Sequence, residues 1–255
     1  DIPADWATAE DHKEAEHLEG PAKLVTMVQD IMEPVAKMDG DSLPVSAFVA
    51  HADGTFEQGA SAYEKRGVAV MVPEWDETKC IQCNRCSYVC PHATIRPFAL
   101  TEEEVAAAPE GLQVAKMTGK GLEALKFTMA VSPMDCMGCG VCVGECPAKE
   151  KAIKMVPRES QEYKQPVFDY LVANVGKKEG MPAKETVKGS QFEKPLLEFS
   201  GSCAGCAETA YARLITQLFG DRMYISNATG CSSIWGGPAA TSPYTVNEKG
   251  HGPAW

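Results

Sequence analysis

Short apolar runs lie on both sides of two polar stretches that carry most of the cysteines. Residues 66–73 and 127–131 contain the β-branched and aromatic residues typical of strands, and each run leads into one of these stretches. Shorter apolar pieces follow the stretches at 94–98 and 152–156. The order strand, loop, strand thus occurs twice, and it predicts an α+β domain built from an internal repeat.

The N-terminal part favours helices. Residues 8–18 are charged and amphipathic, Pro21 follows a break in the pattern, and apolar residues recur at helical spacing over 24–35. Residues 43–49 alternate between apolar and polar, which predicts an extended strand or a crossing segment within a connector. At 101–104 the sequence TEEE predicts a capping box, and therefore a short helix inserted between the two halves of the repeat.

The C-terminal part has a different pattern. Residues 168–175 predict a short helix or an extended arm, and a buried strand is expected at 195–199. A helix over 208–219 and a strand over 223–226 follow, so this part predicts a βαβ unit. The turn at 200–208 would lie at the carboxyl end of the first strand, where α/β folds bind ligands.

Each cysteine-bearing stretch has the spacing C-x2-C-x2-C-x3-C-P, at residues 80–91 and 136–147. This spacing is typical of bacterial ferredoxins with two [4Fe-4S] clusters, in which the fourth cysteine of each run binds the other cluster. We therefore predict two crossed sets of metal ligands. One set is Cys80, Cys83, Cys86 and Cys146, and the other is Cys136, Cys139, Cys142 and Cys90.

Two alternatives explain the cysteines less well. Four-thiolate zinc sites group their ligands as two separated C-x2-C pairs and have no use for a third cysteine or a following proline. A disulfide framework does not suit an odd total of eleven cysteines. His92 follows Cys90-Pro91, but eight cysteines already complete two clusters, so we expect a solvated or hydrogen-bonded histidine.

A third cysteine group lies in the predicted βαβ unit. Cys203 and Cys206 form a C-x2-C, and Cys231 follows the next predicted strand, so the three sulfurs can converge at one sheet edge. A fourth cysteine is missing, and His251 is the only nearby side-chain candidate. A thioredoxin-like redox pair with Cys231 as a bystander explains the spacing equally well.

Composition narrows the class of protein. The formal charge of −11 and the lack of a basic patch argue against nucleic-acid binding. No apolar run approaches the ~20 residues that cross a bilayer, so we expect no membrane partner. Thiolates that hold iron must stay reduced, which favours the cytoplasm. The chain has no initiating Met and ends abruptly, as expected for an internal piece of a longer polypeptide, although processing of the N-terminus explains the start equally well.

Several motifs together resemble the pyruvate:ferredoxin (flavodoxin) oxidoreductase family of 2-oxoacid oxidoreductases. They are SGSCAGCAET at 200–209, NATGCSSIWGG at 227–237, YEKRGVAV at 63–70, PEW at 73–75 and the first cysteine run. The resemblance implies a two-cluster ferredoxin-like domain with an insertion at 60–170. Residues 171–255 would begin an α/β domain that binds thiamine diphosphate, while 1–18 would end a preceding domain and 19–59 would be a connector.

The resemblance also implies cofactors and partners. Cys203, Cys206 and Cys231 would ligate a third [4Fe-4S] cluster whose fourth ligand lies outside this sequence, and Glu208 and Cys231 would border the pocket for thiamine diphosphate and Mg²⁺. Coenzyme A would be a substrate, and ferredoxin or flavodoxin the electron acceptor of a homodimeric enzyme that decarboxylates pyruvate. The chain departs from the family in having no Gly-Asp-Gly motif and no twelfth cysteine. A stand-alone two-cluster carrier, or an electron-transfer subunit of another 2-oxoacid oxidoreductase, is the alternative.

Overall fold

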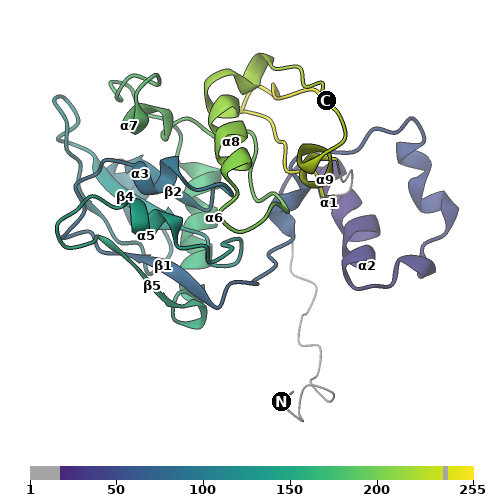
Figure 1. Ribbon diagram of the computed structural model, residues 1–255, viewed down its shortest axis with the longest axis horizontal. Coiled ribbons are helices and arrows are strands. Elements are labelled where there is room, and N and C mark those ends of the chain that lie inside the picture. The colour runs from purple at the N-terminus through teal and green to yellow at the C-terminus, as the bar shows by residue number, and fades with distance from the viewer. Residues whose placement is uncertain (1–17, 238–240) are drawn as a thin grey trace, which may run out of the picture.

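The computed structural model describes residues 18–237 and 241–255. In Figure 1 the strands lie at one side of the molecule, α1 and α2 lie at the other, and α8 and α9 lie between them. The expected helix at 8–18 and the end of a preceding domain at 1–18 lie almost entirely outside the described residues.

The strands form two small antiparallel sheets, and each sheet pairs a strand next to the first cysteine run with a strand next to the second. The strand before the first cysteine run, β1 (Met71–Trp75), pairs with the strand after the second run, β5 (Ile153–Pro157). Conversely, β2 (Ile95–Leu100) pairs with β4 (Lys126–Val131), and the short β3 (Ala115–Lys116) joins the other edge of β4. This exchange of partners brings the two cysteine loops side by side.

The helices are mostly short. In the first half of the chain they are α1 (Ala22–Met27), the π-helical η2 (Val28–Met32), α2 (Glu33–Ala36), the 3-10 helices η3 (Gly40–Ser42), η4 (Val45–His51) and η5 (Ala60–Tyr63), α3 (Arg85–Tyr88) and α4 (Glu102–Ala106). In the second half they are α5 (Val141–Glu145), η6 (Arg158–Ser160), η7 (Glu162–Lys164), α6 (Gln165–Asn174), α7 (Val187–Ser190), α8 (Ala207–Phe219), η8 (Gly220–Arg222) and α9 (Cys231–Gly236).

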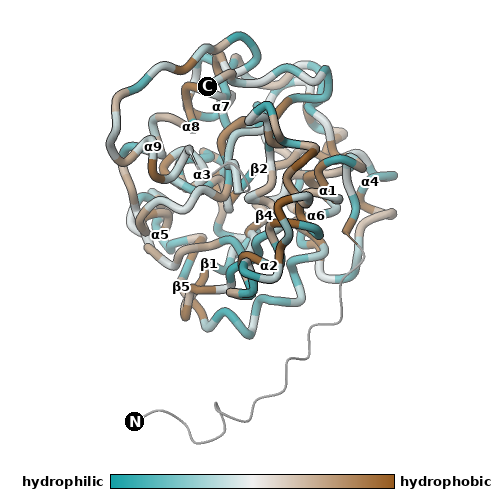
Figure 2. Tube along the Cα trace, turned by 90° about the vertical axis from the view of Figure 1, so that its right-hand side faces the viewer, coloured by the Kyte–Doolittle hydropathy of each residue, from teal (hydrophilic) through white to brown (hydrophobic). Residues whose placement is uncertain are grey.

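The main core lies between the sheets and the cysteine loops. Phe127, Trp75 and Ile153 are buried there together with the thiols of Cys86, Cys90 and Cys142. Helix α6 covers β2 and β4 through a second apolar cluster that includes Phe168 and Leu171. Figure 2 shows apolar and polar stretches alternating along the trace. Within the described ranges, no helix is both long and apolar enough to cross a membrane.

The capping box predicted at 101–104 is present. The Thr101 hydroxyl accepts a hydrogen bond from the Glu104 N–H at 3.2 Å, and the Glu104 carboxylate accepts one from the Thr101 N–H at 2.8 Å. Helix α4 therefore starts the insertion, which continues through β3 and rejoins the repeat at β4. The insertion supplies Lys116 and Thr118, which contact the first cysteine loop.

Of the two structures expected at 43–49, the extended strand is wrong, because Val45–His51 form the 3-10 helix η4. A strand requires a partner strand for its backbone groups, whereas here the bonds are local, as in Ala47 N–H to Pro44 O at 2.9 Å. Val45 is 90% exposed, so the alternation does not mark a buried face.

The predicted βαβ unit is also not formed as a parallel pair. Helix α8 lies where expected, but 195–199 and 223–226 do not pair with each other. Leu197 forms an isolated antiparallel bridge with Tyr244, and Tyr224 forms an isolated parallel bridge with Ala254. The apolar run at 195–199 is buried, yet its backbone groups bond to the C-terminal segment and to His92 instead.

Candidate metal centre

Eight cysteines flank the two sheets at equivalent positions. The first run lies between β1 and β2 with Cys86 in α3, and the second lies between β4 and β5 with Cys142 in α5. Cys139 is exposed, Cys80 and Cys83 are partly buried, and the other five members of the two runs are buried. All eleven cysteines of the chain are free thiols, so the structure contains the donor atoms that iron–sulfur clusters need.

The fourth cysteine of each run lies beside the other run. Cys146 packs with Cys80 in a small apolar cluster. Burial raises the pKa of Cys80, and the nearby thiolates of Cys83 and Cys146 raise it further. Burial likewise raises the pKa of Cys142 to about 12, and the negative charge of the nearby Cys90 thiolate contributes to this rise. These neighbours support the crossed ligand sets, which stay a prediction.

Both loops have the same backbone conformation around the first three cysteines. Gln82 and Asn84 in the first run have φ of 56° and 60°, and Gly138 and Gly140 in the second have φ of 68° and 71°. In this conformation the N–H of Gln82 lies 3.4 Å from the Cys80 sulfur, and the N–H of Gly138 lies 3.4 Å from the Cys136 sulfur. Such N–H donors stabilise anionic cluster sulfur and raise its reduction potential.

The first loop achieves this conformation without glycine. The buried Gln82 side chain donates to Lys116 O at 2.8 Å and accepts from the Thr118 N–H at 2.9 Å, and the Asn84 amide donates to Lys188 O at 2.9 Å. These bonds offset the cost of the left-handed conformation for residues with a Cβ atom. The insertion and α7 therefore hold the first cysteine loop.

A cubane cluster fits this donor set better than a single ion. The indole N–H of Trp75 is buried near Cys80 without a hydrogen-bond acceptor, so this donor is available to sulfur of a bound cluster. In the described part of the chain, no three His, Cys, Asp or Glu side chains are close enough to hold one ion directly. Four thiolates around a cubane stand farther apart than around one ion, because each binds a different iron.

Alanine at Gly138 should destabilise the second loop more than alanine at Gly140. Either substitution costs about 1–2 kcal/mol for the left-handed conformation. At Gly138 the added Cβ would also lie 3.0 Å from Met71 O and 3.2 Å from the Ala69 Cβ, whereas at Gly140 nothing lies within 4 Å. The measurement is the rate of cluster loss under air, followed by the visible absorbance of each variant. Equal rates for the two variants would contradict the role of the Met71 contact.

In the cluster-free chain, iodoacetamide should modify Cys203 and Cys231 long before Cys136 and Cys142. Burial raises the pKa of Cys136 and of Cys142 to about 12, so the reactive thiolate is scarce near neutral pH. Its fraction, and hence the labelling rate, should grow about tenfold for each pH unit up to that pKa. Peptide mass spectrometry at several pH values measures this. A rate for Cys136 that does not change with pH would contradict the prediction.

The third cysteine group lies against the second loop. Cys206 precedes α8, Cys231 is the first residue of α9, and both Cys203 and Cys231 are exposed. A Cβ built on Gly205 would lie 3.5 Å from the Cys139 Cβ, which shows how closely the 203–206 turn approaches the second cysteine run. The convergence of Cys231 with the other two stays a prediction.

His92 joins the two cysteine-bearing regions. Its ring is buried, with Nδ1 at 3.1 Å from Ser200 O and Nε2 at 3.2 Å from Cys203 O. The histidine is thus hydrogen-bonded, as the sequence led us to expect. Because His92 lies two residues after Cys90, it ties the backbone of Cys203 to the loop that carries Cys90. Only the fold shows this contact, because the partners are separated by more than a hundred residues.

Glu208 lines a cavity of about 170 Å³ together with Ser232, Trp235, Tyr244 and Trp255. Burial raises the pKa of Tyr244 to about 12, and the Glu208 carboxylate adds to the effect. The cavity lies between α8, α9 and the C-terminal segment, and Ser232, the residue after Cys231, lines it. Its role in holding thiamine diphosphate stays a prediction.

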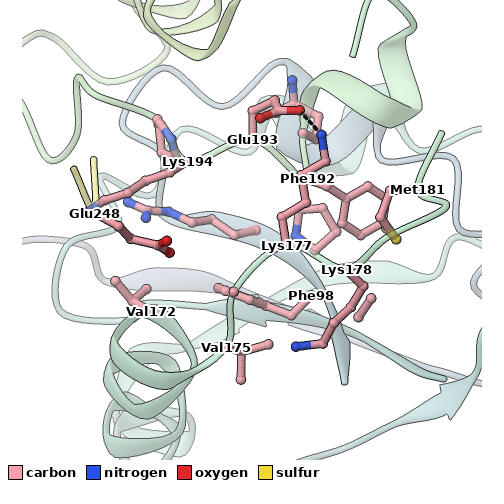
Figure 3. A pocket seen from close by; sticks show the side chains of 16 residues that line it. Phe98, Val172, Val175, Lys177, Lys178, Met181, Phe192, Glu193, Lys194 and Glu248 are labelled. Atoms are coloured by element: carbon pink, nitrogen blue, oxygen red, sulfur yellow. Dashed lines mark hydrogen bonds and ion pairs between the residues drawn. The ribbon is translucent and has the colours of Figure 1, made fainter. Parts of the chain in front are cut away.

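A larger cavity of about 250 Å³ lies between β2, α6 and residues 176–195. Figure 3 shows Phe98, Val175 and Phe192 on its walls and the ion pair between Lys177 and Glu193. Lys178 pairs with Glu104 at 2.6 Å, and Lys194 donates to Val246 O at 3.0 Å. These three lysines already have partners. We therefore interpret the cavity as a gap between β2, α6 and residues 176–195, and not as an anion-binding site.

Two known families match parts of the chain. Residues 79–152, which include both cysteine runs, match a 4Fe-4S dicluster domain. Residues 13–69 match the EKR family, a domain of unknown function.

The whole chain is similar to larger curated proteins. It is 54% identical over 254 residues to a pyruvate-flavodoxin oxidoreductase of Klebsiella pneumoniae, covering 100% of the chain and 21% of that protein. It is 51% identical over 259 residues to the pyruvate:ferredoxin oxidoreductase of Moorella thermoacetica, covering 99% and 21%. A mitochondrial pyruvate dehydrogenase [NADP(+)] of Euglena gracilis is 46% identical over 254 residues, covering 100% and 14%.

The chain spans about a fifth of the length of the oxidoreductases that it matches. The similarity nevertheless runs through nearly every residue of the chain, including the dicluster domain. Over its whole length the chain therefore corresponds to one segment of the pyruvate:ferredoxin and pyruvate-flavodoxin oxidoreductases, a segment that contains a 4Fe-4S dicluster domain.

Proposed function

We propose that this chain is the electron-transfer segment of an enzyme that oxidises pyruvate with coenzyme A. The reaction yields acetyl-CoA, carbon dioxide, a proton and two electrons, which leave one at a time for ferredoxin or flavodoxin. The observation that carries the proposal is that the cysteine-bearing loops adjoin one another in space. The turn around Gly205 lies against Cys139, and the fourth cysteine of each run lies beside the other run. The relatives' names give the substrate and the acceptors.

The cysteine groups define an order for the electrons. The third group (Cys203, Cys206 and Cys231) would receive them first. The set of Cys136, Cys139, Cys142 and Cys90 comes next, because it adjoins the 203–206 turn and is linked to it through His92. The set of Cys80, Cys83, Cys86 and Cys146 comes last and would pass the electrons to the external carrier.

The chain's own residues prepare these sites. [4Fe-4S] clusters supply single-electron storage when bound, and thiamine diphosphate supplies the decarboxylation chemistry. Buried side chains such as Phe127 and Ile153 exclude water from the inner cysteines, while the N–H groups of Gln82 and Gly138 donate to sulfur. His92 holds the Cys203 backbone against the loop that carries Cys90.

The proposal also includes the bounds of two domains and the residues that border the thiamine diphosphate pocket. Residues 60–170 would be the ferredoxin-like domain, and 171–255 the start of a thiamine diphosphate-binding domain. Glu208 and Cys231 would border the pocket for that cofactor and its Mg²⁺. The cavity that Glu208 lines beside Ser232 supports this placement.

Iron and acid-labile sulfide analysis of the full-length protein, purified without oxygen, tests the proposal. We expect about twelve irons per protein, four for each cluster. A Cys203→Ala, Cys206→Ala variant should lose about four of them. Bound zinc with no iron would overturn the proposal.

A two-cluster electron carrier is the second candidate, favoured by the exposure of Cys203 and Cys231. It predicts about eight irons. It also predicts that the Cys203→Ala, Cys206→Ala variant keeps all of them, so one measurement separates the two candidates.

A further inference from the structure

Helix α8 buries an arginine in the interior of the molecule. Arg213 is only 1% exposed, and its neighbours on the inward face of the helix, Thr209, Thr216 and Gln217, are also polar. A polar inward face is unusual for a helix that packs on a protein core, since such faces are normally apolar. The side chain of Arg213 therefore meets a specific set of partners.

Those partners are neutral. The Arg213 Nη2 donates to Tyr88 O at 2.7 Å, and Nη1 donates to Gln191 Oε1 at 3.0 Å and to Gln217 Oε1 at 2.5 Å. The Nε–H has no acceptor, and among the described residues no carboxylate forms an ion pair with Arg213. By contrast, the other deeply buried arginine, Arg96, pairs with Glu198.

A buried guanidinium without a carboxylate needs another negative charge nearby, because desolvating an isolated ion costs several kcal/mol. Tyr88 lies two residues before Cys90, so the carbonyl that accepts from Arg213 belongs to the turn that carries this cysteine. Burial lowers the pKa of Arg213 to about 10, the Cys90 thiolate opposes that effect, and the group stays cationic at neutral pH. A [4Fe-4S] cluster with four thiolate ligands is anionic, and it gains one more negative charge on reduction.

We propose that Arg213 is the buried counter-charge of the cluster that Cys90 helps to bind. By stabilising the reduced form more than the oxidised form, it raises the reduction potential of that cluster. Electrons therefore collect there before they pass to the last cluster, which Cys80, Cys83, Cys86 and Cys146 would bind. The inference rests on the proposed function, because it requires that Cys90 bind a cluster. It makes Arg213 a positioning and electrostatic residue, since the guanidinium donates to the backbone of the loop that carries Cys90.

The geometry also links two of the proposed centres. Helix α8 begins directly after Cys206, which belongs to the third cysteine group, and Arg213 lies two turns further along the same helix. One rigid element therefore supplies a ligand to one centre and a charge to the next. A displacement of α8 would change both at once.

Redox titration of the full-length protein with its clusters loaded, monitored by electron paramagnetic resonance, tests this role. In Arg213→Met, the ratio of reduced to oxidised cluster at a fixed potential should fall at least about tenfold, which equals about 59 mV for a one-electron couple. Arg213→Lys keeps the charge and should shift the potential much less. The affected cluster is identified as the one whose signal also changes in Cys139→Ser.

Gln217→Glu changes the charge beside Arg213 without removing the arginine. It keeps the hydrogen bonds of Arg213 to Tyr88 and Gln191, loses the bond that Gln217 Nε2 donates to Glu193 O at 2.9 Å, and places a carboxylate beside the guanidinium. The potential should therefore fall in the same direction as in Arg213→Met. Arg85→Met is the matched control, because Arg85 also lies in a cysteine loop but is exposed and paired with Glu145. Water screens that charge, and its loss should shift the potential little.

The outcomes distinguish the inference from the proposed function. Full iron content with an unchanged potential in Gln217→Glu would overturn the role of Arg213 and leave the clusters in place. A wild-type protein without iron would overturn both. If Arg213→Met fails to fold, the comparison of Gln217→Glu with the wild-type protein still decides the question.

Discussion

A Cys83→Ala, Cys146→Ala double variant should lose one cluster, about four irons, whereas a Cys139→Ala, Cys146→Ala variant should lose two clusters, about eight irons. The reason is that Cys146 packs beside Cys80 and would serve the first set, together with Cys83. Removing two ligands from one cluster prevents its assembly, and removing one ligand from each of two clusters damages both. Iron and acid-labile sulfide content, measured without oxygen, gives the result.

The mirror experiment supplies the control. Cys90 would serve the second set, so Cys90→Ala should combine with Cys139→Ala to remove one cluster and with Cys83→Ala to remove two. If each run bound its own cluster with all four cysteines, both experiments would give the reverse pattern. That reversal would refute the exchange of ligands between the two loops.

Arg96→Met should destabilise the protein by about 3–5 kcal/mol, because it leaves the Glu198 carboxylate buried without its partner. Both side chains of this ion pair are more than nine-tenths buried, and the guanidinium also lies 5.4 Å from the ring centre of Phe168 and 5.1 Å from that of Phe199. The pair joins β2 to the segment at 195–199. Urea unfolding followed by circular dichroism without oxygen should show the loss.

Lys154→Met is the matched control for that experiment. Lys154 forms an ion pair with Glu74 at 2.9 Å, but its side chain is 70% exposed. Exposed pairs contribute about 0–1 kcal/mol, so the midpoint of unfolding should change little. Equal effects of Arg96→Met and Lys154→Met would mean that burial of the Arg96 pair has no energetic consequence.

The sequence predicts the parts of the fold in which local pattern and tertiary pairing agree. Strands flank both cysteine runs as predicted, and the helix over 208–219 and the capping box at Thr101 occur. The first strand, predicted at 66–73, lies at Met71–Trp75, so residues 66–70 are not part of it. The strand expected at 43–49 is not formed, because no second strand in the described part of the chain pairs with it and local bonds form instead. The βαβ unit fails because the apolar run at 195–199 finds its partners in the C-terminal segment, and a single segment's pattern does not specify its partner.

The candidate site divides in the same way. The cysteines follow from spacing alone, because cluster geometry fixes the separation of the ligands along the chain. Gln82, His92 and Arg213 have no such signal, since their roles depend on residues 34 to 125 positions away. A buried arginine on an otherwise ordinary amphipathic helix becomes visible only when the helix is seen packed against the cysteine loops.

The pairing of β1 with β5 has a consequence for biosynthesis. Residue 71 at the start of one strand pairs with residue 157 at the end of the other, so the sheet closes only after the intervening chain has been made. During translation, the first cysteine run would leave the ribosome long before its completing partner strand. With the crossed ligand sets that we propose, neither set of four cysteines is complete until the second cysteine run has emerged, so cells would have to shield the early thiols from oxidation in the meantime.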